Sequence, residues 1–548
     1  MSTHPAQPTA NSPASARVAF VGAGPGDPGL LTVRARDYLA AADVVLLDTL
    51  HDLTLVAPHV RAEATVLEAG QGPSGHPLTP ASRAKLVVRT AQRSAPVGGL
   101  VVRLMDGQPG AFTGLAAEAL ACRQAGVAFE IVPGVSAAWS VPAYAGIPLT
   151  GPDAGELHVV DASDRHTDWT LSVPQQVTVV VLGTADDLRR ALTGLLAAGR
   201  DGTTPVCLTG HGTTVHQHTT VCTLREAAEA LADEALGSAA VAVVGQPVSL
   251  REELSWFETK PLFGWNVLVP RTKEQSGAMT GRIAFHGATA EVVPTISVEP
   301  PRTRQQMDRA IRGLVTGRYE WIGFTSVNAV RAVREKFTEV GLDARAFAGL
   351  KIAAVGGVTA DALRSWGLEP DLVPTGEQSA SGLLEDWPPF DEVLDPINRV
   401  FLPRADIATE TLVAGLQQMG WEVDDVTAYR TVRAAPPPAP VREAIKSGAF
   451  DAVCFTSSST VRNLVGIAGK PHPNTVVACI GPATARTAEE HGLRVDVVAP
   501  EPRAESLVDA LADFARGAAA AAVESGETAQ RPSQRRTAAR RKVVKARA

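Results

Sequence analysis

The second half of this 548-residue chain contains the same pattern twice. The segment WIGFTSVNAVRAVREKF, from Trp321, is echoed about 130 residues later by DAVCFTSSSTVRNLV, from Asp451. Likewise KIAAVGGVTADALRSWGLEPDLV, from Lys351, is echoed by VVACIGPATARTAEEHGLRVDVV, from Val476. Each copy alternates an apolar run with an amphipathic stretch, which indicates strands followed by helices. The repeat therefore predicts two similar α/β lobes with a ligand cleft between them.

The Thr and Ser residues of the repeat fall where a predicted strand ends and a helix begins. At such a position a hydroxyl can cap the helix, while free N–H groups of its first turn face the cleft. Helix N-termini favour anions because their backbone N–H groups carry partial positive charge. We therefore expect the cleft to suit a ligand that carries many carboxylates.

Length and cysteine content favour a multidomain cytoplasmic protein. At 548 residues the chain is long enough for several domains. The five cysteines (Cys122, Cys207, Cys222, Cys454 and Cys479) have no CxxC spacing, which favours reduced buried thiols over disulfides or a metal site. No apolar run approaches the ~20 residues of a membrane span. Residues 1–16 lack the features of a secretory signal, so we expect a disordered leader there.

Charge is unevenly distributed along the chain. The net charge is −7, but residues 531–548 hold eight basic residues and no acidic ones, so the rest of the chain carries −15. The basic tail is able to touch nucleic acid or an acidic partner, whereas a solvated tail is the plainer interpretation. We expect residues 516–548, which are Ala-rich and then basic, to be disordered. The acidic body argues against nucleic acid as the main ligand.

In the first half, apolar runs lead into Gly- and Pro-rich loops. The runs at 18–21, 100–104 and 129–132 enter GAGPGDPG, MDGQPG and PGVS, and helical patterns follow, which predicts a mostly parallel sheet. Further strands are expected at 158–160, 177–182, 205–208 and 240–244, in a second small α/β domain that ends near residue 260. A dinucleotide-binding GxGxxG starting at Gly22 fails because its last position is Asp27.

Over about residues 18–257 the chain resembles the uroporphyrinogen-III C-methyltransferases, within the tetrapyrrole methyltransferase family. The resemblance rests on VGAGPGDPGLLTVRA, VVRLMDGQPGAF, IVPGVSAAWSVPAYAGIPLT and AVVGQPVSLREELSWF. It implies that S-adenosylmethionine lies between two small domains and methylates a pyrrole carbon of uroporphyrinogen III. Members of that family often pair, which leaves a homodimer through the N-half open. The cofactor-binding residues that we expect are Gly24, Pro25, Gly26, Asp48, Gly107, Gln108, Pro109, Pro133, Pro148 and Leu182.

Several positions depart from that family's pattern. The second loop usually reads Lys-Gly-Gly-Asp-Pro-Phe, whereas residues 105–110 read MDGQPG. A Tyr-Met-Gly strand end is replaced by residues 181–183, VLG, and the His-Arg that follows Ile-Pro-Leu-Thr is replaced by Gly151 and Pro152. Two alternatives remain, an active methyltransferase and a retained fold that serves assembly or regulation. The histidines of GHGTTVHQH (His211, His216 and His218) lack acidic or Cys partners at ligand spacing, which favours a polar loop over a zinc site.

Residues 261–514 resemble uroporphyrinogen-III synthase. PLFGWNVLVPRT, FTSVNAV, VGGVTADAL, FLPRAD, VTAYRTV, CFTSSSTV and IGPATA occur in that order. The resemblance implies one lobe at about 265–298 and 433–514 and the other at about 299–432. It also implies cyclisation of hydroxymethylbilane with inversion of its last pyrrole ring, a reaction for which we expect no cofactor.

This chemistry needs an acid for the leaving hydroxyl and a firm hold on a polyanionic chain. Tyr429, in VTAYRTV, is the expected acid, and a buried tyrosine that anchors the hinge is the alternative. Arg271 and Arg404 follow strand ends, where either a carboxylate clamp or a structural ion pair fits. The hydroxyl residues expected to bind substrate, with plain N-capping as the alternative, are Thr325, Ser326, Thr359, Thr456, Ser457, Ser458 and Thr484, and Ser379 and Ser381 are expected to line the site.

We therefore predict a uroporphyrinogen-III synthase that carries a methyltransferase-like domain. The first alternative is a bifunctional enzyme that also methylates its product to precorrin-2. A non-enzymatic alternative is a two-lobed ligand sensor whose basic tail contacts DNA.

Overall fold

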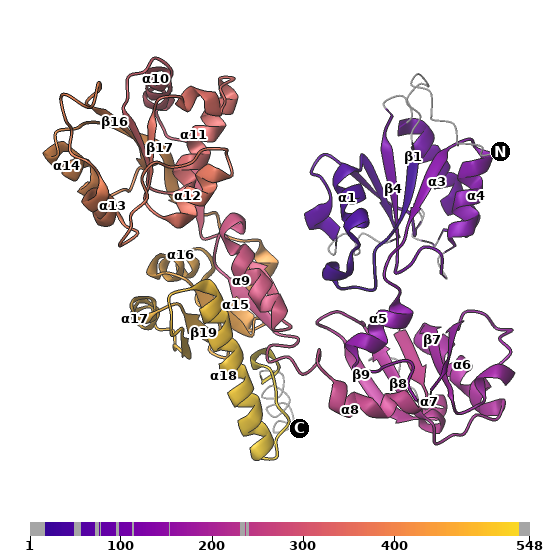
Figure 1. The fold of residues 1–548 in the computed structure, drawn as a ribbon. Coiled ribbons are helices and arrows are strands. Elements are labelled where there is room, and N and C mark those ends of the chain that lie inside the picture. Colours follow the sequence, from indigo (N-terminus) through magenta and orange to yellow (C-terminus); the bar gives the residue numbers. More distant parts are fainter. Residues whose placement is uncertain are drawn as a thin grey trace. The chain divides into compact units, whose positions relative to one another are not determined.

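The computed structural model describes residues 17–48, 56–71, 76, 78–94, 98–111, 114–152, 154–230, 236 and 240–535 (Figure 1). The chain forms two compact units. Unit 1 runs to Trp265 and includes Phe285–Thr289, whereas unit 2 holds Asn266–Ala284 and continues from Ala290. The predicted disordered leader, and the part of the tail from residue 536, lie outside the described residues.

Unit 1 begins with a five-stranded parallel sheet in the order β3-β2-β4-β1-β5. Both faces are covered, since Leu47 packs with Leu39 on one face and Leu46 packs with Val87 on the other. Burial on both faces explains why these strands read as short, continuous apolar runs. The elements are β1 Arg17–Gly22, α1 Val33–Ala41, β2 Val44–Leu47, β3 Thr65–Glu68, α3 Pro80–Ser94, β4 Leu100–Met105, α4 Leu115–Gln124 and β5 Ala128–Val132.

The second sheet of unit 1 has the order β6-β7-β10-β8-β9 and is mixed. β6 and β7 are parallel, whereas β10 runs antiparallel to β7 and β8, and β9 runs antiparallel to β8. The sequence did not predict β9, because this edge strand is largely exposed and has no apolar run. The elements are α5 Ala137–Tyr144, β6 Glu156–Asp161, β7 Val177–Gly183, α6 Ala185–Ala197, β8 Pro205–Gly210, β9 His218–Thr223, α7 Leu224–Ala230, β10 Ala240–Val244 and α8 Arg251–Leu254.

Unit 2 contains two five-stranded sheets, as the repeat predicts. Lobe 1 holds the sheet β12-β11-β18-β19-β20, in which β11, β18, β19 and β20 pair in parallel. Its elements are β11 Asn266–Val269, α9 Lys273–Phe285, β12 Thr289–Val292, α15 Ala439–Ser447, β18 Ala452–Phe455, α16 Ser458–Ala468, β19 Val476–Cys479, α17 Pro482–Glu490, β20 Val497–Val498 and α18 Ala504–Glu524.

Lobe 2 holds the sheet β13-β17-β16-β14-β15, which is parallel except for β13. β13 pairs with β17, so the chain enters this lobe at about residue 295, a few residues before the predicted crossing at 298. The elements are β13 Ile296–Glu299, α10 Arg304–Val315, β14 Trp321–Phe324, α11 Val327–Glu339, β15 Lys351–Ala354, α12 Gly357–Arg364, α13 Ala380–Asp386, β16 Arg399–Ala405, α14 Thr411–Gln418 and β17 Glu422–Arg433.

Matched hydrogen bonds show that the two lobes are structural repeats. Asp371 accepts a bond from the N–H of Ile352 at 2.7 Å, where β15 begins in lobe 2. At the same place in lobe 1, where β19 begins, Asp496 accepts a bond from the N–H of Val477 at 3.0 Å. Shared backbone geometry therefore accompanies the shared sequence pattern.

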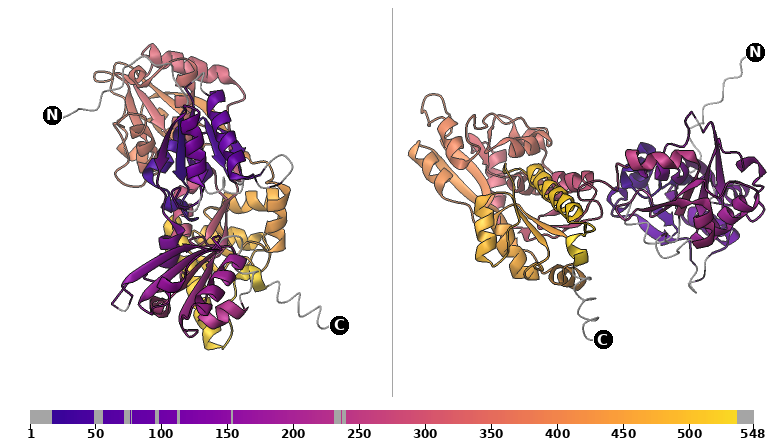
Figure 2. Two further views of the ribbon diagram at one scale, coloured as in Figure 1. Left: turned by 90° about the vertical axis from the view of Figure 1, so that its right-hand side faces the viewer. Right: turned by 90° about the horizontal axis from the view of Figure 1, so that it is seen from below.

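The alanine-rich segment after residue 515 is helical, which corrects the expectation of disorder from residue 516. It completes α18, the long helix coloured yellow in Figures 1 and 2, which buries Leu507 and Leu511 against the sheet of lobe 1. The chain then returns, and the N–H of Ser533 donates to Asp451 Oδ1 at 2.9 Å. Alanine is the best helix former, and a docked helix needs only one apolar face, so low complexity did not imply disorder here.

Candidate active sites

Tyr429 lies in β17, beside a register irregularity between β16 and β17. Its ring is buried in the core of lobe 2, with 7% of the residue exposed. Its hydroxyl oxygen lies 2.9 Å from Ser326 Oγ, at the carboxyl end of β14. Tyr429 also lines a pocket of about 230 Å³ together with Asn328 and Arg331. The hydroxyl of Tyr429 is therefore fixed by a partner that follows β14, two strands away in the sheet, and the residue borders the pocket.

Two serines cap equivalent helices with nearly identical backbone geometry. Ser326, before α11, has φ −167° and ψ 158°, and Ser457, before α16, has φ −168° and ψ 160°. Ser326 Oγ accepts from the N–H of Ala329 at 3.1 Å, and Ser457 Oγ accepts from the N–H of Thr460 at 3.3 Å. The capping alternative holds for both serines, although Ser326 also bonds Tyr429.

The helices that carry Thr359 and Thr484 are capped by glycine. Gly356, before α12, and Gly481, before α17, are both fully extended, and neither supplies a side-chain cap. Thr359 and Thr484 are each the third residue of their helix, so they are not N-caps and the capping alternative does not apply to them. Thr359 is 5% exposed and Thr484 is 4% exposed. Among the described residues, their hydroxyls have no hydrogen-bond partner. Neither hydroxyl oxygen is among the buried atoms that lack a partner, so each oxygen keeps some accessible surface. Each first turn therefore carries an accessible, unpaired hydroxyl on a largely buried threonine, and this hydroxyl is able to bind an incoming carboxylate.

The remaining hydroxyl residues have mixed surroundings. Thr325 and Thr456 are half-buried directly before the capping serines. Ser458 donates to the carbonyl of Ala483 at 3.1 Å and accepts from Thr487 at 2.9 Å, so it ties α16 to α17. Ser379 caps α13, and Ser381, in the same helix, is exposed.

The two predicted arginine clamps differ in what they contact. Arg404 is 4% exposed, its Nε donates to Asp425 Oδ1 at 2.5 Å, and its Nη1 donates to the carbonyl of Thr409. The hydrogen bond with Asp425 raises the pKa of Arg404, so this arginine forms the structural ion pair rather than an open clamp. Arg271 is half-buried and has no ion pair with a described residue, and burial lowers its pKa while the charge of Glu505 opposes this. Of the two, only Arg271 is available to a substrate.

One residue near α12 was missed by the sequence analysis. Gln378 Oε1 accepts a hydrogen bond from the N–H of Gly357, at the first residue of α12, at 3.1 Å. The partners are 21 residues apart in sequence, and no motif links them. Only the predicted position of Ser379, next to Gln378, pointed towards this segment.

In unit 1 the loops after β1, β4 and β5 meet at glycines. The N–H of Ala23 donates to the carbonyl of Met105 at 2.8 Å, and Gly24 and Gly107 exchange two backbone hydrogen bonds. A Cβ on Gly134 would lie 2.1 Å from the carbonyl oxygen of Gly107, which no real side chain tolerates. Gly24 and Gly107 have positive φ, of 75° and 57°, which also favours glycine. The three loops therefore form a close-packed surface of backbone atoms around Gly22, Gly107 and Gly134, which we call the glycine cradle. A Cβ at its centre would fill the space between the loops.

Several of the predicted cofactor residues belong to this cradle. Gln108 Oε1 accepts from the N–H of Gly134 at 3.2 Å, so it bridges two of the loops. Gly24, Pro25, Gly26 and Gly107 lie in the first two loops, with Pro109 after Gln108 and Pro133 in the loop after β5. Leu182 and Pro148 lie in the second domain of unit 1, in β7 and after α5.

Asp48, directly after β2, lies in a charged network with Arg103 and Glu118. Its Oδ1 accepts from Arg103 Nη2 at 2.7 Å, and Arg103 is 1% exposed and also pairs with Glu118 at 2.9 Å. The carboxylate of Asp48 therefore neutralises the buried Arg103, and it is not an unpaired acid that a ribose hydroxyl could bind. Met105, which stands where the resembling family has lysine, is buried in the apolar core beside Phe20.

The histidine-rich loop joins the two domains of unit 1. The hydroxyl of Thr213 accepts from the N–H of Asp27 at 3.0 Å, and Tyr144 donates to Asp27 Oδ2 at 2.7 Å. His211 and Thr213 both have positive φ, an uncommon conformation for residues other than glycine. Within the described ranges, no group of three or more His, Cys, Asp or Glu residues is arranged to hold a metal ion. All five cysteines are unpaired.

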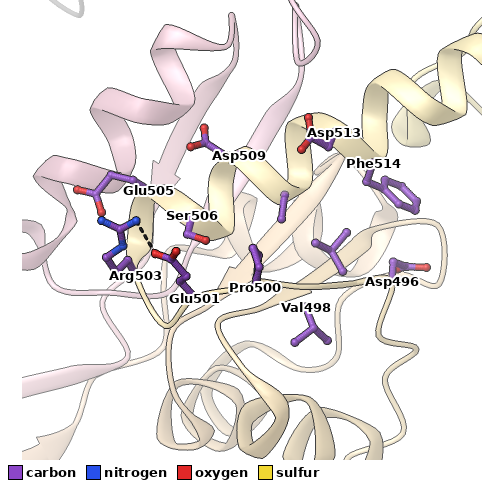
Figure 3. Close-up of a pocket in the computed structure, with 12 residues that line it drawn as sticks. Asp496, Val498, Pro500, Glu501, Arg503, Glu505, Ser506, Asp509, Asp513 and Phe514 are labelled. Atoms are coloured by element: carbon purple, nitrogen blue, oxygen red, sulfur yellow. Dashed lines mark ion pairs between the residues drawn. The ribbon is translucent and has the colours of Figure 1, made fainter.

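The largest pocket that we describe, of about 810 Å³, lies between β20 and α18 and includes none of the predicted site residues in its lining (Figure 3). Its apolar lining includes Val498 and Phe514. One arginine, Arg503, pairs with Glu501 at its edge, as the dashed line marks. The acidic residues Asp496, Glu501, Glu505, Asp509 and Asp513 outnumber that arginine, so the pocket does not suit a polyanionic substrate.

Comparison with known proteins identifies both halves. Residues 17–228 match the family of tetrapyrrole (corrin/porphyrin) methylases, and residues 277–509 match uroporphyrinogen-III synthase HemD. The porphyrin biosynthesis protein HemD of Ruminiclostridium josui is 31% identical over 511 residues, which cover 91% of this chain and 98% of that protein. The chain belongs to the HemD family. It is an enzyme with a uroporphyrinogen-III synthase domain and a methylase domain, so the predicted fusion and α/β fold are confirmed, and the sensor alternative has no support.

Other relatives match the N-half alone. The uroporphyrinogen-III C-methyltransferase of Bacillus subtilis (strain 168) is 32% identical over 250 residues, 44% of this chain and 95% of that protein. Siroheme synthase 2 of Yersinia pestis (strain Pestoides F) is 38% identical over 254 residues, so this chain spans 51% of its length. A solved uroporphyrin-III C-methyltransferase from Thermus thermophilus, complexed with S-adenyl homocysteine, is 30% identical, with a TM-score of 0.36 and coverage of 43% of this chain and 99% of that one. Within the described part of the HemD family chain, no helix is long and apolar enough to cross a membrane.

Proposed function

We propose that unit 2 cyclises hydroxymethylbilane to uroporphyrinogen III with Tyr429 as the general acid. The observation that carries this proposal is the hydrogen bond of 2.9 Å between the Tyr429 hydroxyl and Ser326 Oγ. This bond supports the proposal because it holds a hydroxyl group near the end of β14, in the lobe that also carries Thr359.

The reaction begins when Tyr429 gives its proton to the terminal hydroxyl, which leaves as water. The resulting azafulvenium-like cation is attacked by the substituted carbon of the last pyrrole ring. The spiro intermediate fragments and recloses with that ring inverted. Loss of a proton from carbon restores the aromatic pyrrole and returns the proton to the phenolate. One water is lost, and no oxidation state changes.

Binding of the substrate's carboxylates is the second task of the site. We assign it to the first turns of α12 and α17, each with an unpaired threonine hydroxyl. The partial positive charge of a helix N-terminus favours a carboxylate by ~0.3–1 kcal/mol at an exposed site. Arg271 adds a cation that has no ion pair with any described residue. Because the linear substrate also cyclises unaided to the wrong isomer, such a hold on its shape decides the product.

For unit 1 we propose that S-adenosylmethionine binds at the glycine cradle. The close approach of Gly22, Gly107 and Gly134 supports this, since it leaves backbone groups at the centre of the three loops. The bound cofactor would supply an electrophilic methyl group for a pyrrole carbon. Gln108 would hold two loops of the cradle in register. The alternative of a retained but inactive scaffold rests on the changed loop at residues 105–110.

A product assay tests both halves. Freshly generated hydroxymethylbilane is supplied with and without S-adenosylmethionine, and products are separated by chromatography and mass. Type III isomer without the methyl donor supports the synthase, and two added methyl groups with the donor support the bifunctional enzyme. Type I isomer alone refutes the synthase assignment, and type III isomer with no mass gain refutes the active methyltransferase.

A further inference from the structure

The amide of Gln378 lies across the start of α12. A Cβ on Gly356 would come within 2.7 Å of Gln378 Oε1, and one on Gly357 would lie 3.9 Å from both polar atoms of that amide. Gly356 has φ 180°, a conformation open to any residue. The neighbouring amide, rather than backbone strain, is therefore what a side chain at residue 356 would meet.

The hydrogen bond to Gly357 fixes which end of the amide is which. A backbone N–H can only donate, so the atom that it meets at 3.1 Å must be the amide oxygen. The Nε2 group then remains with two N–H donors and no acceptor among the described residues. Gln378 is exposed, so these donors are accessible to a ligand at the first turn of α12.

The equivalent helix of lobe 1 is built differently. α17 begins with Pro482, which has no N–H, and nothing lies within 4 Å of a Cβ on Gly481. The first residue of α17 in lobe 1 has no N–H because it is proline. The first residue of α12 in lobe 2, Gly357, has an N–H and donates it to Gln378. Only lobe 2 gains a side-chain donor beside its buried threonine.

We propose that Gln378 positions a substrate carboxylate in lobe 2. Its Nε2 donates to the carboxylate that the hydroxyl of Thr359 also binds, so that this carboxylate is held by a side-chain amide, a hydroxyl and the first turn of α12. The inference rests on the proposed synthase function and adds a residue to its site. It also makes the carboxylate sites of the two lobes unequal. This difference would let two nearly symmetric lobes bind a linear substrate in one orientation.

The test compares Gln378→Glu and Gln378→Ala with the wild-type chain. Glutamate keeps an oxygen for the N–H of Gly357 and adds an anion at a helix N-terminus, so we expect the Tm to stay level or rise. The same anion repels the substrate carboxylate, so we expect KM for hydroxymethylbilane to rise ~10-fold or more. Alanine removes the donor without adding charge, and we expect KM to rise ~3–10-fold with a larger share of type I isomer.

Gln305→Glu is the matched control, because Gln305 is an exposed residue in the first turn of α10 of the same lobe. It introduces the same charge at another helix N-terminus and should leave KM within ~2-fold of wild type. A purely structural role for Gln378 predicts that Gln378→Glu binds substrate normally, and that result would overturn the proposal. Failure of the wild-type chain to make type III isomer would instead reject the synthase function, so the two failures are distinct.

Discussion

Replacing Tyr429 by phenylalanine removes a single oxygen from the proposed acid. The ring stays in the core of lobe 2, and Ser326 Oγ keeps its bond to the N–H of Ala329. Only one hydrogen bond, of 2.9 Å, is lost, so we expect the free energy of unfolding to fall by about 1 kcal/mol. General acids contribute roughly 10²–10⁴-fold to a rate. We therefore expect kcat to fall at least ~100-fold, which is about 2.7 kcal/mol of activation free energy.

The assay follows the type III isomer from freshly generated hydroxymethylbilane, with the spontaneous type I product measured in the same chromatogram. Tyr319→Phe is the matched control, because Tyr319 is a buried tyrosine of the same lobe whose hydroxyl donates to Asp424 Oδ2 at 2.7 Å. It should cost similar stability while turnover stays near the wild-type value. If Tyr429→Phe keeps a kcat within ~3-fold of wild type, Tyr429 is a hinge anchor and not the acid.

Other substitutions test the remaining contacts. Thr359→Val and Thr484→Val keep the side-chain volume but remove the hydroxyls, so KM for hydroxymethylbilane should rise several-fold in each; unchanged KM values would remove these threonines from the site. Gly134→Ala forces a Cβ to within 2.1 Å of a carbonyl oxygen of the β4 loop, and thermal denaturation should show unit 1 destabilised by at least ~2 kcal/mol. Gln108→Asp restores the acid of the resembling family and should raise the rate of methyl transfer. Met105→Lys instead buries a charge at a residue that is 1% exposed, so it should lower the Tm. Equal effects of the two variants on methyl transfer and on the Tm would contradict this difference between the two positions.

Most predictions for unit 2 came from the sequence repeat. Strand ends and helix starts follow from hydrophobic periodicity, so the placement of Ser326 and Thr359 at helix starts was readable from the sequence. Whether a hydroxyl caps a helix depends on which residue has the extended backbone, and Gly356 takes that place instead of Thr359. The partner of Arg404 was equally hidden, because Asp425 lies on the next strand, 21 residues away.

In unit 1 the loops were easier to predict than the contacts between them. Glycine and proline mark the turns directly, whereas the meeting of Gly107 with Gly134 depends on the order of parallel strands in the sheet. Asp48 illustrates the limit, because an acid at a strand end fits a ribose as well as an arginine. Arg103, in an otherwise apolar strand, was the available signal that a buried cation needed a partner.

In the proposed site both lobes bind carboxylates, whereas one lobe alone supplies the acid. Ser326 and Ser457 have the same backbone geometry and cap equivalent helices, yet their hydroxyls meet different groups. Ser326 bonds Tyr429, whereas Ser457 lies 2.8 Å from the hydroxyl of Ser459. The proposed acid belongs to lobe 2 because Tyr429 lies in β17, the strand that leads back to lobe 1. Since the reaction inverts one ring of four, an enzyme with two equal lobes would lack the means to choose that ring. Tyr429 and Gln378 both belong to lobe 2, so under both proposals the same lobe supplies the proton and the added carboxylate contact that orient the substrate's reactive end.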